Sequence, residues 1–169
     1  MYVRLFEGVR VAGLTGRIGR LGRIAEPAPP PPEAAQGLGV GRGSLQLRHV
    51  DAGSCNGCEV EISGCFSPVY DAERYGVRLV ASPRHADGVL VSGVVTRNMS
   101  SALADTVNAV AAPRGVVAVG DCACDGGLFL EAYGVVGPAG AVVPVDVEVP
   151  GCPPAPADIV DALRRITGR

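Results

Sequence analysis

The sequence contains no lysine, only two histidines and no long apolar run, and each of these shortages limits what the protein can do. No stretch approaches the roughly 18 apolar residues that span a bilayer, so we expect any membrane association to come through surface contact or a partner. All 15 cationic residues are arginines, and the net charge of -2 gives no general attraction to nucleic acid. We therefore predict a soluble or peripheral protein that does not bind nucleic acid.

The residue sets that enzymes use for acid–base, nucleophilic or nucleotide chemistry are also absent. With His49 and His85 as the only histidines, no Ser/His/Asp arrangement can be argued. The GxxxxGK(S/T) signature of a phosphate-binding loop does not occur. We expect the chain to catalyse nothing by itself.

The N-terminal stretch lacks the apolar core of a secretory signal peptide, because glycines and arginines interrupt MYVRLFEGVRVAGLTGRIGR every few residues. A reducing, cytoplasmic compartment is therefore favoured. In such a compartment the six cysteines are less readily explained as a disulfide framework.

Composition divides the chain into three parts. Residues 1–24 carry several arginines against a single acid and predict a basic N-terminal arm. Residues 25–44 are rich in proline and glycine and predict a linker. Residues 45–169 are long enough to form one domain with a substantial core.

From residue 45 onward, short β-branched runs alternate with helical stretches, which is typical of βαβ units. We expect strands at residues 45–50, 77–81, 88–92, 116–119 and 143–149. We expect helices at residues 59–64, 68–75, 100–112 and 155–166. The predicted fold class is α/β, with an open, mostly parallel sheet and helices on both faces.

Four cysteines fall directly after predicted strands. The first strand is followed by Cys55 and Cys58, the fourth by Cys122 and the fifth by Cys152. The carboxyl ends of parallel strands lie along one edge of the sheet, where such folds place their ligand sites. The sequence therefore predicts that three separate segments bring four thiolates together.

Four convergent thiolates suit either a 4Fe-4S cluster or a structural zinc ion. Glycines beside the cysteines, including Gly57 and Gly151, let backbone N–H groups approach a negatively charged cluster. A zinc knuckle more commonly has two Cys-x-x-Cys pairs, so iron–sulfur is favoured. A zinc-stabilised binding module and a thiol-disulfide oxidoreductase that uses Cys55 and Cys58 remain as alternatives.

The other two cysteines are assigned differently. Cys65 lies seven residues after Cys58 on the same predicted helix, and we interpret it as a small buried hydrophobic residue. Cys124 lies two residues after Cys122 and is either an alternative ligand or a spare thiol.

The chain resembles a known family in four motifs: GSCNGCEVEI, SPRHADGVLVSGVVTRNM, GDCACDGG and VPVDVEVPGCPPAPADIVDAL. The family comprises the cluster-bearing small subunits of membrane-bound, energy-converting (group 4) NiFe hydrogenases, including formate hydrogenlyase, and the 20 kDa (B) subunit of respiratory complex I. The resemblance covers about residues 45–165 in the same order. It implies a flavodoxin-like electron-transfer subunit with one 4Fe-4S cluster on Cys55, Cys58, Cys122 and Cys152.

The resemblance also implies partners. These are a hydrogenase-type or complex I-type large subunit, a ferredoxin-like polyferredoxin subunit, and membrane subunits that hold the complex on the cytoplasmic side of the cell membrane. Two residues separate Cys55 from Cys58, as in hydrogenases, whereas the complex I relatives have adjacent cysteines. A hydrogenase-type complex is therefore favoured over a complex I-like NADH-quinone oxidoreductase.

The same resemblance also suggests roles for three charged residues. Arg97 follows a strand end at the cysteine edge, where its guanidinium is expected to hydrogen-bond a cluster sulfur, unless it is solvated or paired with a partner. Glu59 and Glu61 resemble an acidic pair in the hydrogenase relatives. They are expected to face the catalytic partner or to be ordinary exposed helix acids.

Overall fold

The computed structural model describes residues 43–169, and residues 1–42 lie outside the described part. The predicted basic arm and nearly all of the predicted linker fall outside it. The N–H of Gly43 donates to the carbonyl oxygen of Thr167 at 2.9 Å, so the described chain starts beside its own C-terminal segment. Among the described residues, no helix combines the length and the hydropathy needed to cross a membrane.

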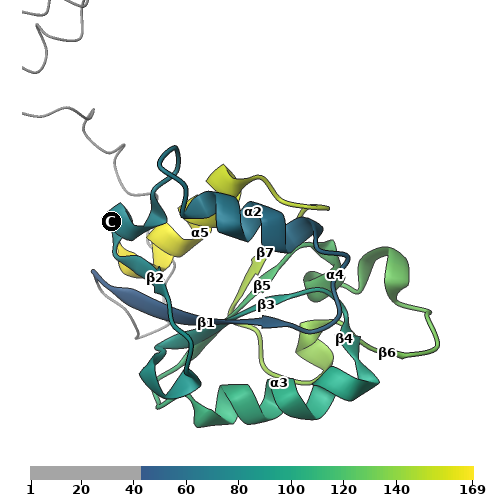
Figure 1. Cartoon of the computed structure of the whole chain (residues 1–169). Helices are drawn as coiled ribbons and strands as arrows, with labels where there is room; N and C mark the ends of the chain where they lie inside the picture. Colours follow the sequence, from purple (N-terminus) through teal and green to yellow (C-terminus); the bar gives the residue numbers. More distant parts are fainter. Residues whose placement is uncertain (1–42) are drawn as a thin grey trace, which may run out of the picture. The chain divides into compact units, whose positions relative to one another are not determined.

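Five parallel strands form one sheet in the order β2-β1-β3-β5-β7 (Figure 1). The strands are β1 (Leu45–Asp51), β2 (Val77–Leu79), β3 (Gly88–Ser92), β5 (Gly115–Val119) and β7 (Val147–Val149). Neighbouring strands are parallel throughout this sheet. The chain order reverses between β1 and β3, as in flavodoxin-like sheets. The predicted α/β fold is confirmed.

Helices cover both faces of the sheet (Figure 1). One face carries α2 (Gly57–Cys65) and α5 (Pro156–Thr167), and the other carries α3 (Arg97–Ala109). The two faces consequently have separate hydrophobic cores. A mostly parallel sheet needs this double cover because its strands are apolar on both sides.

Strand β3 shows how one run of residues serves both cores. Its five residues are all buried. Leu90 packs into the core under α2 and α5, whereas Val89 and Val91 pack into the core under α3. Successive side chains of a strand point to opposite faces, so a continuous apolar run can fill both cores.

The C-terminal helix α5 follows its sequence signals closely. Pro156 stands in its first turn together with Asp158, and Arg164 and Arg165 stand in its last turn. Proline fits the first turn because its missing N–H has no helical partner there, and the charges oppose the helix dipole. The helix predicted at residues 155–166 is therefore confirmed with small shifts at both ends.

Several short elements were not predicted. Strands β4 (Val95–Thr96) and β6 (Val135–Gly137) pair antiparallel in a small second sheet, and α4 (Asp121–Cys124) follows β5. Elements of two to four residues are too short to show a hydrophobic period. The helix expected at residues 68–75 is reduced to a 3-10 helix over Ala72–Tyr75.

The carboxyl ends of four strands are aligned at one edge of the sheet. Asp51 is the register partner of Ser92, Ser92 of Val119, and Val119 of Val149. The loops that follow β1, β3, β5 and β7 therefore leave the sheet from a common line. This edge is where an open parallel sheet positions a functional site.

Candidate metal centre

Four cysteine thiols from three loops meet beyond this edge. Cys55 lies between β1 and α2, and Cys58 lies in the first turn of α2. Cys122 lies in α4, and Cys152 follows β7. The thiols of the other three lie close enough to Cys58 to raise its pKa electrostatically. The four cysteines predicted from the strand ends thus lie at the same edge of the sheet, and their role as ligands stays a prediction.

Burial and mutual proximity both raise the pKa of the inner thiols. The pKa of Cys58 is raised to about 12, mainly by burial and then by the Glu59 carboxylate and the other three thiols. Burial also raises the pKa of Cys122, with Cys152 and Cys55 as the next contributors. Metals bind cysteine as the thiolate, so loading this group of thiols must release protons.

The short helix α4 separates the two cysteines of the second motif. Each helical residue turns the chain by about 100°, so residues two apart point in widely different directions. Cys122 faces the other thiols, whereas Cys124 packs against the core under α3, with its Sγ 3.8 Å from the carbonyl oxygen of Ala118. Burial and nearby carboxylates raise the pKa of Cys124 to about 11. This geometry favours Cys122 over Cys124 as the fourth member of the thiol group.

Glycine backbone lines the thiols. A Cβ on Gly120 would overlap the Sγ of Cys58, and a Cβ on Gly57 would lie 3.5 Å from the Sγ of Cys55. At Gly120 the backbone has φ +90°, which side chains other than glycine rarely adopt. The thiols are therefore bordered by bare backbone that leaves room for a bound group and lets N–H groups come near it.

Asp121 joins the second and third cysteine loops. Its N–H donates to the carbonyl oxygen of Gly151 at 2.9 Å, and the N–H of Gly151 donates to Oδ1 of Asp121 at 2.6 Å. These reciprocal hydrogen bonds fix Cys122 and Cys152 relative to each other. Sequence reasoning missed Asp121, although its place beside the cysteine in the motif GDCACDGG is a usable signal.

The remaining predicted residues have other contacts. Cys65 is fully buried and its Sγ donates to the carbonyl oxygen of Glu61 at 3.2 Å, in agreement with a packing role. The guanidinium of Arg97 lies over the ring of Tyr133, 4.9 Å from its centroid. A hydrogen bond from Arg97 to a cluster sulfur stays a prediction.

Glu59 is held in a network that the sequence did not reveal. Ser54 Oγ donates to its Oε2 at 2.6 Å, and Ser92 Oγ donates to its Oε1. The Nε2 of His49 lies 2.8 Å from Ser92 Oγ. The single hydroxyl hydrogen of Ser92 is given to Glu59, so His49 must donate to Ser92 through an Nε2–H. The Glu59 side chain is only 15% exposed and is not the solvated helix acid that was one of the expectations.

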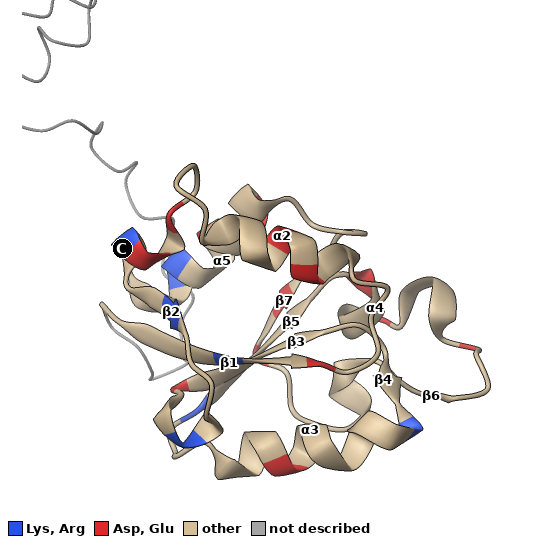
Figure 2. Ribbon diagram, in the orientation of Figure 1, with Lys and Arg blue, Asp and Glu red and all other residues tan. Residues whose placement is uncertain are grey.

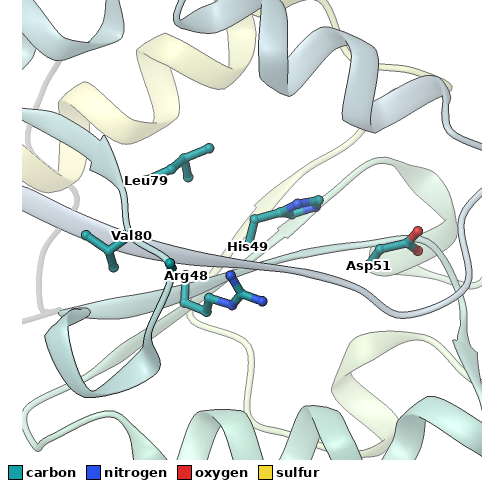
Figure 3. Close-up of a pocket in the computed structure, with 6 residues that line it drawn as sticks. Arg48, His49, Asp51, Leu79 and Val80 are labelled. Atoms are coloured by element: carbon teal, nitrogen blue, oxygen red, sulfur yellow. The ribbon is translucent and has the colours of Figure 1, made fainter.

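His49 connects this network to a surface pocket of about 510 Å³ at the end of β1 (Figure 3). The pocket is lined by Arg48, His49, Asp51, Leu79, Val80 and Ala81. Figure 3 shows His49 and Arg48 on opposite sides of the strand. The imidazole therefore has one edge bonded inside the protein and another near solvent.

The state of His49 predicts a pH dependence of stability. Burial lowers its pKa from the ordinary 6.5, against the opposing effects of Glu59 and Asp51 and together with a smaller effect of Arg48. Between the lowered folded pKa and 6.5 the unfolded chain binds more protons, so the free energy of unfolding must fall as the pH drops through this window. Between pH 7.5 and pH 5.5, the free energy of unfolding measured with urea is expected to fall more in the wild type than in His49→Gln. Equal losses in the two proteins would contradict the assignment.

The spacing of the four thiols also bears on what they can hold. Within residues 43–169, no three His, Cys, Asp or Glu side chains are grouped tightly enough for a single metal ion. A zinc ion needs its sulfur ligands about 2.3 Å from one point. An iron–sulfur cluster is larger and is held by cysteine thiolates at separate irons. Four thiolate donors suit an iron–sulfur cluster and also a structural zinc ion, and the glycine backbone beside them leaves room for the larger group.

The fold and the site define an α/β protein that presents four thiols at the carboxyl edge of a parallel sheet. Residues 55–166 match the family described as NADH ubiquinone oxidoreductase, 20 Kd subunit. The chain is 46% identical over 115 residues to the probable membrane-bound hydrogenase subunit mbhJ of Pyrococcus furiosus, covering 68% of this chain and 69% of that protein. It is 46% identical over 114 residues to formate hydrogenlyase subunit 7 of Escherichia coli, covering 68% of this chain and 45% of that protein.

Among solved structures, the membrane-bound sulfane sulfur reductase, an archaeal respiratory membrane complex, contains a similar chain. The TM-score is 0.65 at 30% identity, over 75% of this chain and 70% of that one. The chain belongs to the NADH ubiquinone oxidoreductase 20 Kd subunit family. It is accordingly a member of a family of oxidoreductase subunits, and the predicted resemblance is confirmed.

Proposed function

We propose that the chain is the electron-transfer subunit of a multisubunit oxidoreductase of the group 4 NiFe hydrogenase or formate hydrogenlyase type. One 4Fe-4S cluster is bound by Cys55, Cys58, Cys122 and Cys152. The observation that carries the proposal is the convergence of these thiols from three strand-end loops. Relatives named as hydrogenase and formate hydrogenlyase subunits support the type of complex.

When bound, a 4Fe-4S cluster carries one electron at a time. The chain's own residues hold and shield it: Cys58 and Cys122 are buried and form the inner side, and Cys55 and Cys152 are exposed and form the outer side. Asp121 keeps the second and third loops together. A cluster bound there would supply one-electron transfer between the clusters of a ferredoxin-like subunit and the active site of the large subunit, in either direction.

Metal and sulfide analysis tests the proposal on protein purified without oxygen together with its large-subunit partner. The expected result is about four irons and four acid-labile sulfides per chain, with an EPR signal that appears after dithionite reduction. About one zinc per chain without such a signal would support the four-cysteine binding module instead. Insulin reduction that needs only Cys55 and Cys58 would support a thiol-disulfide oxidoreductase.

An exposed apolar segment beside the thiols is the proposed contact for the large subunit. Between α4 and β6 the exposed side chains include Leu128, Phe129, Leu130 and Tyr133. A Cβ on the neighbouring Gly127 would lie 3.2 Å from the Sγ of Cys122, so this segment continues directly from the thiol group. Within residues 128–133 the one charged residue is Glu131, and Figure 2 shows most of the loop in tan. Contiguous exposed apolar side chains of this kind are typical of a protein–protein contact.

Placing a charge in this segment is expected to weaken the complex. Leu128 is 89% exposed, so Leu128→Asp should leave the fold intact and bury an unpaired carboxylate only in the interface. The binding free energy between the chain and the large subunit is expected to weaken by about 2 kcal/mol, which is roughly a thirtyfold weaker affinity. Retention of the large subunit on the purified chain measures this effect. The matched control is Val69→Asp, at an 80% exposed valine between α2 and β2. Equal retention in both variants would contradict the proposed contact.

A complex I-like NADH-quinone oxidoreductase is the second candidate, and the family match supports it. The sequence of the neighbouring large subunit distinguishes the two. Two Cys-x-x-Cys pairs near its termini would support NiFe, and their absence would exclude hydrogen chemistry. In either case the complex is proposed to lie on the cytoplasmic side of the cell membrane, with this chain peripheral and residues 45–169 as the iron–sulfur domain.

A further inference from the structure

The Glu59 carboxylate lies beside the thiol group and is largely shielded from solvent. It directly follows Cys58 in α2, and its side chain is 15% exposed. Both of its oxygens accept hydroxyl hydrogens, one from Ser54 and one from Ser92. Its field reaches the nearest sulfur, because after burial it is the largest cause of the raised pKa of Cys58.

The two serines are themselves fixed by the fold. Ser92 ends β3 and is fully buried. The N–H of Ser54 donates to Oδ1 of Asp51 at 2.8 Å, and a Cβ on Gly93 would overlap the backbone of Ser54. The carboxylate is thus held from both sides by groups that the sheet edge places. Such hydrogen bonds to an ionised acceptor are stronger than those between neutral groups.

No cation neutralises this carboxylate among its nearest described partners. The closest candidate is His49, whose Nε2 lies 3.9 Å from Oε1. Burial lowers the pKa of His49, so at neutral pH the imidazole is uncharged and acts only as a hydrogen-bond donor to Ser92. Arg48 lies on the opposite side of β1 (Figure 3). The described hydrogen-bond donors to the Glu59 carboxylate are therefore the neutral hydroxyls of Ser54 and Ser92.

We propose that Glu59 lowers the reduction potential of the cluster held by the four cysteines, and that Ser92 and Ser54 are positioning residues for its carboxylate. Reduction adds one negative charge to the thiolate-bound group. A fixed negative charge nearby makes that step less favourable, and ionic screening weakens this effect little when the charge is shielded from solvent. The inference rests on the proposed function, because it requires the cluster to be present.

The neighbouring Glu61 provides a matched control. It lies two residues further along the same helix and raises the pKa of Cys65, which is not among the four cysteines. It has the same side chain, and it is not among the main causes of the raised pKa of Cys58 or Cys122. Replacing Glu61 is therefore expected to change the potential much less than replacing Glu59.

The test is an EPR-monitored redox titration of the anaerobically purified complex at low and high ionic strength. The proteins compared are the wild type, Glu59→Gln, Glu59→Asp and Glu61→Gln, each with its iron and sulfide content measured first. The midpoint potential of Glu59→Gln is expected to shift to more positive values and to keep this shift in high salt. Glu59→Asp should return toward the wild type, and Glu61→Gln should match it.

The outcomes separate this inference from the proposed function. A wild type without iron and sulfide would refute the proposed function and the inference with it. Full iron content with an unchanged potential in Glu59→Gln, or an equal shift in Glu61→Gln, would overturn the inference alone. If Glu59→Gln does not retain iron, Ser92→Ala decides, because it removes one of the two hydroxyls that hold the Glu59 carboxylate in place. A more positive midpoint potential in Ser92→Ala then supports the inference, and an unchanged or more negative one overturns it.

Discussion

Replacing Cys122 with serine is expected to abolish normal assembly of the cluster. The iron and sulfide contents should fall from about four per chain to below about one, and the EPR signal of the reduced complex should disappear. The physical reason is that Cys122 is buried among the other thiols, where a serine hydroxyl does not replace a thiolate ligand. Iron and sulfide analysis of the purified complex measures the effect.

Two other cysteines provide the controls. Cys124→Ser and Cys65→Ser are expected to retain the full iron content, because each thiol contacts a main-chain carbonyl oxygen, that of Ala118 for Cys124 and that of Glu61 for Cys65. Each substitution buries a hydroxyl and should lower the free energy of unfolding by roughly 1–3 kcal/mol. Equal iron contents in Cys122→Ser and Cys65→Ser would refute the ligand assignment. Loss of iron in Cys124→Ser but not in Cys122→Ser would show that Cys124, and not Cys122, is the ligand.

Gly120→Ala is the second change with a large expected effect. The backbone there has φ +90° and ψ 152°, a region that is almost exclusive to glycine and costs other residues about 1–3 kcal/mol. The added Cβ would also overlap the Sγ of Cys58 and push that thiol out of the group. We expect both a lower free energy of unfolding and a loss of bound iron, measured by urea unfolding and iron analysis.

Gly140→Ala is the matched control for this change. A Cβ at Gly140 meets nothing within 4 Å, and the residue lies exposed in the 3-10 helix Ala139–Ala141. Its free energy of unfolding should change by no more than about 0.5 kcal/mol, and its iron content should equal that of the wild type. If Gly120→Ala retained full iron, the close contact between Gly120 and Cys58 would not constrain the site.

Much of the fold could be predicted because strands and helices leave repeating patterns of apolar residues in the sequence. The apolar run of β3 and the end signals of α5 can each be recognised from neighbouring residues alone. Once the strands are placed, the parallel connection brings Cys55, Cys122 and Cys152 to one edge without further information. The parallel sheet is confirmed, whereas its strand order was not predicted.

The parts that were missed depend on geometry that no local pattern contains. The sequence assigned Cys122 rather than Cys124 through the register of the motif alone, because the helix α4 that separates the two side chains has too few residues to show a period. The hydrogen bonds of Glu59 needed the register that places Ser92 beside Asp51. Neither the alternation of a strand nor the charge of a helix predicts which hydroxyl will reach a carboxylate two elements away.

The Asp121–Gly151 hydrogen bonds divide the ligand set into two halves with different freedom to vary. One half consists of Cys122 and Cys152, whose loops are held together by the two hydrogen bonds between Asp121 and Gly151. The other half is a self-contained stretch between β1 and the first turn of α2, which supplies Cys55 and Cys58 alone. This other half has no part in these two hydrogen bonds, and it meets the rest of the site through other contacts: Cys58 lies against Gly120, and Glu59 accepts a hydrogen bond from Ser92 of β3. The two pairs of cysteines are therefore tied to the sheet in different ways, the Cys122 pair through hydrogen bonds beside β5 and β7 and the Cys58 pair through the side chain of Glu59.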